Sequence, residues 1–111
     1  MLDKKHRINK KAEYNYIYKN GKKIQGRYII VFIASNTLEY SRFGIVSSKK
    51  TGNAVVRNRA KRQLRAIIHN NLNKINGGYD TVIITRYNIT QADFKLMEKD
   101  LLSIFKKARL I

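Results

Sequence analysis

The sequence predicts an α+β fold, an αβββαβα two-layer sandwich in which helices pack on one small mixed sheet. Three stretches place apolar residues at helical spacing, and four shorter runs are rich in the Ile, Val and Phe typical of strands. A length of 111 residues suits a single domain, residues 1–111, and a core of that size forms without cysteine, which the chain lacks.

The N-terminal region is expected to contribute a basic arm and the first helix. We expect residues 1–8 to form a flexible arm that contains His6. The first helix is predicted over about residues 10–20, because Asn9 is a suitable N-cap and Gly21 follows the last turn. The i, i+3, i+4 spacing places on one helix face Tyr14, Ile17 and Tyr18.

Three strands are predicted next, over residues 22–25, 28–35 and 41–48. The second is the most apolar of the three, and Asn36-Thr37 begins the turn that follows it. The third alternates imperfectly, and its pattern places on one face Phe43, Ile45 and Ser47.

The second helix has the clearest pattern in the chain. Asn53 is predicted to cap its N-terminus, and Gly77-Gly78 is predicted to end it. The 3.6-residue period defines a core face made of Val56, Ala60, Leu64, Ile67, Ile68, Leu72 and Ile75.

A fourth strand and a third helix complete the predicted fold. The strand covers residues 79–86, and its uninterrupted apolar run 82–84 indicates burial on both faces. The last helix is predicted to start at a capping box formed by Thr90 and Asp93. Its core face consists of Phe94, Met97, Leu101, Ile104, Phe105 and Ala108.

Charge is the strongest functional signal. The chain has 24 Lys and Arg against 7 Asp and Glu, a net charge of +17, and no acid lies between Glu39 and Asp80. A compact chain with this charge repels itself unless its working partner is a polyanion. A basic block inside a folded segment therefore predicts a nucleic-acid-binding surface.

Several other classes of protein are disfavoured. Thiol chemistry is excluded because there is no cysteine, and seven dispersed acids make a carboxylate metal site unexpected. His69 is expected on the helix surface, so no imidazole has an evident catalytic partner. The apolar run 28–34 is too short to cross a bilayer, and the start of the chain does not resemble a signal peptide. A cytosolic protein without membrane contact is expected.

The second helix is predicted to present cations beside its core face. Arg57, Lys61 and Arg65 follow i, i+4, i+8 spacing and form one stripe. Guanidinium forks match phosphate oxygens in a bidentate manner, and backbone N–H groups at a helix N-terminus also favour phosphate. The same end of the helix carries or adjoins Lys49, Lys50, Asn53, Asn58, Arg59 and Arg62.

This region resembles a known signature. The segment from Ser48 to Arg65 is similar, without a gap, to the pattern S-K-K-x-G-N-A-V-x-R-N-R-x-K-R-x-x-R of bacterial ribonuclease P proteins. The likeness extends to Arg7-Ile8 with residues 14–21, to residues 27–32 and to residues 81–86, so it covers nearly the whole chain.

The resemblance implies a fold and two RNA contacts. The family's fold, like that of the second domain of a small-subunit ribosomal protein, has a left-handed crossover between parallel strands. Contact with the catalytic RNA is implied for Lys49, Asn53, Arg57, Asn58, Arg59, Lys61, Arg62 and Arg65. A cleft for the single-stranded 5′ leader of precursor tRNA is implied at Tyr14, Tyr18, Ile30, Phe32, Lys50, Arg57, Asn58, Lys61 and Arg65.

The implied chemistry belongs to the RNA. In the family the RNA subunit removes the leader with Mg²⁺, which RNA and substrate hold, so the resemblance implies no catalytic residue and no metal held by the protein alone. It also implies a protein that is monomeric by itself. Aromatic side chains stack unpaired bases at about 1–3 kcal/mol each, and nearby cations bind the backbone, which suits a leader of any sequence. The departures from the family pattern are Val46, Ser47, Gln63 and Thr85.

Three alternatives remain open at this point. A ribosomal or RNA-chaperone protein would share the composition but would not stimulate tRNA processing. A DNA-binding regulator would insert the basic helix into a major groove and prefer duplex DNA. An autonomous nuclease would cleave without an RNA subunit, although the scarcity of acids argues against it.

Overall fold

The computed structural model describes residues 3–111, and the order of its elements is the predicted αβββαβα. The elements are α1 (Lys11–Asn20), β1 (Lys22–Gln25), β2 (Ile29–Ser35), β3 (Arg42–Val46), α2 (Ala54–Asn71), β4 (Tyr79–Thr85) and α3 (Phe94–Lys107), with short 3-10 turns between some of them. The first strand has the predicted bounds, and the other three are slightly shorter than predicted.

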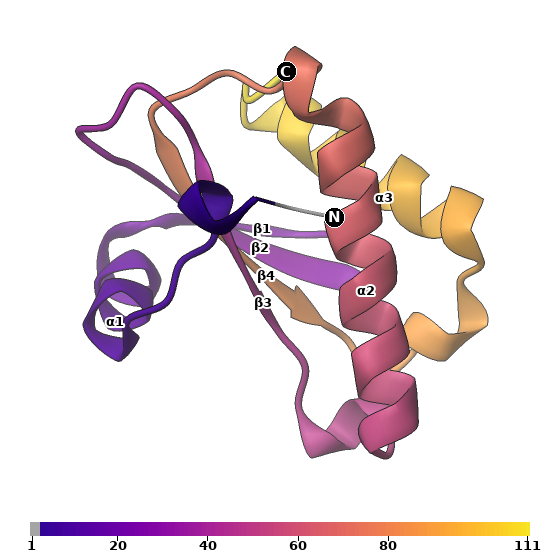
Figure 1. The fold of residues 1–111 in the computed structure, drawn as a ribbon. Helices are drawn as coiled ribbons and strands as arrows, with labels where there is room; N and C mark the ends of the chain where they lie inside the picture. Colours follow the sequence, from indigo (N-terminus) through magenta and orange to yellow (C-terminus); the bar gives the residue numbers. More distant parts are fainter. Residues whose placement is uncertain (1–2) are drawn as a thin grey trace.

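The four strands form one mixed sheet in the order β1-β2-β4-β3 (Figure 1). The β1–β2 and β2–β4 pairs are antiparallel, whereas β3 and β4 are parallel and are joined through α2. The small mixed sheet predicted from the sequence is thus confirmed. The left-handedness implied for the crossover through α2 stays a prediction.

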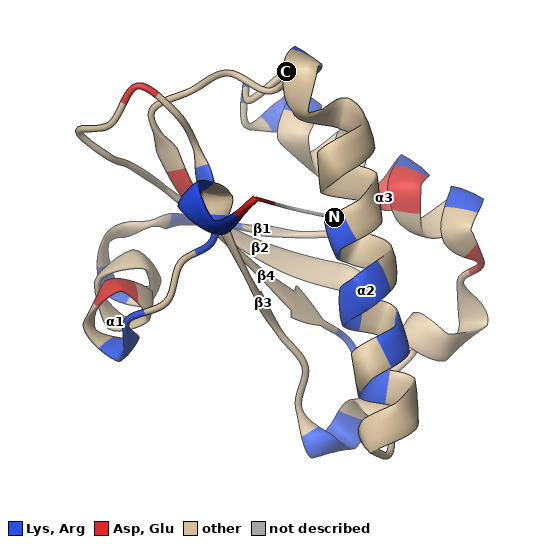
Figure 2. Ribbon diagram, viewed as in Figure 1, with Lys and Arg blue, Asp and Glu red and all other residues tan. Residues whose placement is uncertain are grey.

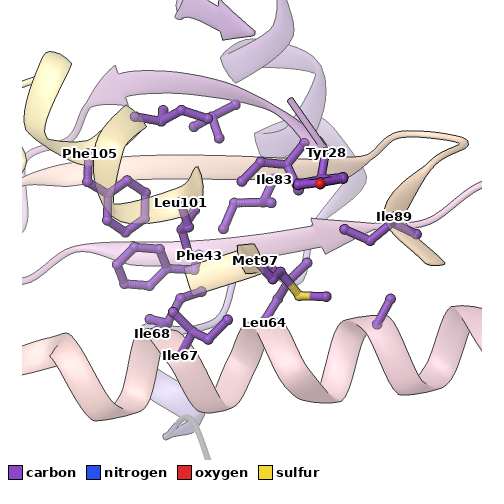
Figure 3. Packing of buried hydrophobic residues seen from close by; sticks show 14 of the residues in the cluster. Tyr28, Phe43, Leu64, Ile67, Ile68, Ile83, Ile89, Met97, Leu101 and Phe105 are labelled. Carbon is purple, nitrogen blue, oxygen red and sulfur yellow. The ribbon is translucent and has the colours of Figure 1, made fainter. Parts of the chain in front are cut away.

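Helices cover both faces of this sheet. Helices α2 and α3 pack against one face and bury the main core, as Figure 3 shows for Leu64, Ile67 and Ile68 of α2 pointing at the strands. Helix α1 lies on the opposite side of the sheet (Figure 1). The predicted two layers describe the sheet with α2 and α3, and α1 adds a partial third layer.

Strand β4 is buried on both faces, which explains the uninterrupted apolar run at its centre. Val82 belongs to the small core under α1, together with Ile8 and Ile17, while Ile83 belongs to the main core. Both side chains are fully buried. The prediction of a strand covered on both faces is confirmed.

One predicted helix N-terminus agrees with the structure and two differ. Asn53 accepts a hydrogen bond from the Val56 N–H (3.0 Å), which confirms it as the N-cap of α2. Helix α3 begins after Asp93, which accepts from the Leu96 N–H (2.8 Å); Thr90 lies in a preceding 3-10 turn, so the predicted box was wrong. Asn9 was also wrong as a cap, because α1 begins after Lys10.

Helix α2 ends earlier than predicted. It stops at Asn71, whose side-chain amide donates to the Ile67 carbonyl (2.8 Å) and to the Glu98 carboxylate (3.1 Å). A side chain that bonds its own backbone competes with helix continuation. Gly77 serves a different purpose, since a Cβ there would meet the Glu39 carbonyl oxygen.

The N-terminal segment differs from the predicted arm. Residues 1 and 2 lie outside the described residues, but residues 4–8 pack against the edge of the sheet. His6 is buried and its Nδ1 donates to the Ser41 carbonyl (2.8 Å), and Arg7 forms a parallel bridge with Phe43. The segment therefore protects the open edge of β3, which would otherwise expose unpaired backbone groups.

Candidate nucleic-acid interface

An apolar row on the α1 side of the sheet is left partly open. Strand register aligns Val46, Ile84, Ile30 and Gln25 across all four strands. Aligned partners share a face, and the first three side chains are all partly exposed. Helix α1 covers the rows beside them, where Ile17 is buried. We call this partly open strip beside α1 the cleft, because it contains Ile30, one of the residues for which the resemblance implies a leader cleft.

Tyr18 and Phe32 form the aromatic part of this cleft. Their rings meet edge to face with centroids 5.2 Å apart. Tyr18 is 37% exposed and Phe32 is half-buried, so both rings keep surface available to a ligand. Burial raises the pKa of Tyr18, and Tyr14 adds to that rise.

Tyr14 is held more firmly against the fold. Its hydroxyl donates to the Ile8 carbonyl (3.1 Å) and lies directly over Gly44, where a Cβ would come within 2.5 Å of the hydroxyl oxygen. Burial raises the pKa of Tyr14, an effect that Arg65 opposes and Glu13 reinforces. Tyr14 and Arg65 together line a small pocket of about 140 Å³. The structure thus brings α1 and the predicted basic stripe to one place.

The basic stripe of α2 lies on the cleft side of the helix. Arg57, Lys61 and Arg65 are all partly buried. Arg65 lies beside Tyr14, and residues four apart share a helix face, so Arg57 and Lys61 lie on the same side of α2 as Arg65. The Nε of Arg57 is buried without a hydrogen-bond partner. Figure 2 shows the blue bands that run along α2 and the turn before it, without a red band among them.

The other predicted RNA-binding residues of α2 lie elsewhere on the helix. Asn58 and Arg62 are exposed on the outer surface of α2. Arg59 and Gln63 lie on the flank away from the stripe, where they line a hollow of about 580 Å³ with residues 89–94. The structure therefore distributes the predicted RNA-binding residues of α2 over the cleft side, the outer surface and the opposite flank of the helix.

The turn before α2 presents further cations. Lys49 and Lys50 are exposed in a 3-10 turn at the end of β3, and Asn53 is exposed at the helix N-terminus. Gly52 has a φ of 150°, which an L side chain rarely adopts. A glycine is required at this position of the turn, which sets the direction in which the helix starts.

Two departures from the family pattern compensate each other. The hydroxyls of Ser47 and Thr85 share a hydrogen bond of 2.7 Å, and Thr85 also meets the hydroxyl of Thr51 at 3.0 Å. Thr51 and Thr85 are both buried. The chain of hydroxyls joins the basic turn to β4, and the hydroxyl of Ser47 has its hydrogen-bond partner in Thr85.

We expect Thr85→Val to lower the free energy of unfolding by about 1–2 kcal/mol, because Ser47 and Thr51 lose a buried partner while volume is kept. Combining it with Ser47→Ala should cost less than the sum of the single changes. Urea unfolding measures both, with the exposed Thr37→Val as control. Strictly additive losses would show that the hydroxyls are not coupled.

Sequence reasoning missed part of the cleft. It named Ile30 and Phe32 but not Ile84, and it treated Val46 only as a departure. It also missed Lys23, whose Nζ lies 5.9 Å from the centroid of the Phe32 ring. Alternation within each strand was visible in the sequence, but the strand order that aligns these residues was not.

Several carboxylates are engaged within the fold. Glu13 and Asp80 both pair with Arg42, while Asp100 accepts the backbone N–H groups of Arg27 and Tyr28. Among residues 3–111, no group of three or more His, Cys, Asp or Glu side chains is placed to hold a metal ion. The helices of this part of the chain are also too short or too polar to cross a membrane.

Comparisons with known proteins show the family to which this chain is similar. The family model described as Ribonuclease P matches residues 2–109. The ribonuclease P protein component of Syntrophomonas wolfei is 44% identical over 110 residues, covering 99% of this chain and 92% of the relative. That of Fusobacterium nucleatum is 44% identical over 108 residues, covering 94% and 97%. A Staphylococcus aureus RNase P protein mutant with defective mRNA degradation activity superimposes with a TM-score of 0.91 at 31% identity, covering 97% and 92%.

Proposed function

This chain belongs to the ribonuclease P protein family, and on that premise we propose that it is the protein subunit of a tRNA-processing ribonuclease P. In this proposal α2 binds the catalytic RNA, and the cleft beside α1 binds the 5′ leader of precursor tRNA. One observation carries this proposal. The partly open apolar and aromatic surface beside α1 meets the cationic stripe of α2 at the pocket that Tyr14 and Arg65 both line.

The cleft suits a single strand better than a duplex. Tyr18 and Phe32 offer ring surface to unpaired bases, and partly buried Arg57, Lys61 and Arg65 supply cations along one edge. Aliphatic side chains cannot form hydrogen bonds with base edges, so this surface accepts leaders of many sequences. The exposed side of α2, with Asn58 and Arg62, and the turn with Lys49 remain available to a second RNA.

The protein's role in this proposal is binding rather than bond cleavage. Because the carboxylates near the cleft are paired with Arg42, they are poorly placed to hold Mg²⁺. The catalytic RNA and the substrate would hold that ion. A cationic protein beside the bound substrate offsets phosphate repulsion, and it thereby lowers the metal concentration that the complex needs.

Multiple-turnover cleavage of a precursor tRNA at low Mg²⁺ tests the proposal. A bacterial ribonuclease P RNA is used with and without this protein, and a third reaction contains the protein alone. We expect stimulation of the RNA and no cleavage by the protein alone. Failure to stimulate a matched RNA would favour a general RNA-binding protein, and cleavage without RNA would favour an autonomous nuclease.

A further inference from the structure

Building on the proposed function, we infer that the leader path crosses the whole sheet and ends at strand β1, where Lys23 binds a phosphate distant from the cleavage site. This would make Lys23 a determinant of how the protein distinguishes long leaders from short ones. If the leader does not bind the cleft at all, this inference fails with the proposed function, so the test below separates the two.

Strand register places Lys23 on the cleft side. Lys23 pairs with Phe32, and Phe32 pairs with Val82 in the small core under α1. Its neighbour Lys22 pairs with Ile33, which is buried on the side of the main core. Adjacent lysines on one strand therefore point to opposite faces of the sheet.

Lys23 has surroundings that suit a phosphate. Both salt bridges found within residues 3–111 use Arg42, so Lys23 is in neither of them. Its Nζ lies over the Phe32 ring, and that ring meets Tyr18. A base stacked against Tyr18 or Phe32 would bring its own phosphate within reach of this ammonium group. Cation and aromatic rings thus combine as in other single-strand grooves.

The orientation of the leader follows from the position of α2. In the proposed complex α2 contacts the catalytic RNA, so the nucleotides next to the cleavage site lie at the β3 side of the sheet. Four strands at a spacing of about 4.8 Å span roughly 14 Å, which about four stacked nucleotides cross at roughly 3.4 Å each. Only nucleotides beyond that distance reach β1 and Lys23.

Binding assays with two precursor tRNAs that differ only in leader length test this inference. A leader of about two nucleotides is too short to reach β1, whereas one of about eight nucleotides is long enough. The ribonucleoprotein complex is assembled with the unchanged chain, with Lys23→Ala, with Lys22→Ala as matched control, and with Tyr18→Ala as a probe of the cleft itself.

We expect Lys23→Ala to weaken binding of the long-leader substrate by about 3- to 10-fold and to lower the salt slope by about 0.7, with no change for the short-leader substrate. Lys22→Ala should change neither. An equal effect of Lys23→Ala on both substrates, or none on either, would overturn the inference. If Tyr18→Ala is also without effect on the long-leader substrate, the proposed leader cleft itself is wrong.

Discussion

Replacing Asp80 with alanine is expected to lower the free energy of unfolding by about 2–3 kcal/mol, the largest stability effect we predict for a single change. Asp80 accepts two hydrogen bonds from Arg42, at 3.0 Å from Nε and 2.6 Å from a terminal nitrogen, and a third from the Asn36 amide at 2.8 Å. Its side chain is only 11% exposed. Removing it leaves these donors without their main acceptor.

The effect should exceed that of an ordinary surface pair. Breaking a fully buried pair costs about 3–5 kcal/mol, and an exposed pair contributes at most about 1 kcal/mol. The Arg42 side chain is 20% exposed and also binds Glu13 of α1 at 2.7 Å, so this pair lies between those limits. The carboxylate of Asp80, followed by that of Glu13, holds the pKa of Arg42 above its usual range.

Urea unfolding with matched variants measures this prediction. Glu39→Ala also removes one negative charge, but Glu39 is exposed, so that variant reports the cost of added net charge alone. Glu13→Gln should lose only about 0.5–1 kcal/mol. A double change of Arg42 and Asp80 to apolar residues should be milder than Asp80→Ala. If Asp80→Ala and Glu39→Ala lose the same amount, the pair contributes no specific stability.

The Arg42 cluster also shows what sequence reasoning could not supply. The helices were predictable because apolar periodicity is a local property, and Asn53 was predictable as a cap for the same reason. The pairing of Arg42 with Glu13 and Asp80 joins residues distant in sequence, and nothing in their spacing indicates it. The packing of His6 against Ser41 is equally non-local, so the local sequence predicts a flexible basic arm where the structure has a packed segment.

The candidate site was predictable to a similar degree. The stripe of Arg57, Lys61 and Arg65 follows from helical spacing alone, and the structure keeps it on one side of α2. The cleft floor depends on the order β1-β2-β4-β3, in which the last two neighbours are parallel. A chain read in sequence order would place β2 beside β3, so it would miss the row in which Ile84 lies between Ile30 and Val46.

Changing Arg57, Lys61 and Arg65 together to glutamine is expected to weaken binding to ribonuclease P RNA with its precursor tRNA by roughly 100-fold, the largest functional effect we predict. An ordinary hydrogen bond contributes about 1 kcal/mol net and a charge-assisted one more, so three losses sum to at least about 3 kcal/mol. Because each lost phosphate contact removes a released counterion, the slope of log affinity against log salt should fall by about 2–3.

Net charge alone would also weaken binding, so the control must remove as many cations elsewhere. Lys95, Lys99 and Lys106 are exposed on α3, and changing all three to glutamine lowers the charge by the same amount. Glutamine is nearly as good a helix former as lysine or arginine, so both helices should persist. If the α3 variant loses as much affinity and slope as the α2 variant, binding depends on overall charge. A loss confined to the α2 variant means that the stripe itself contacts RNA, because both variants remove three positive charges.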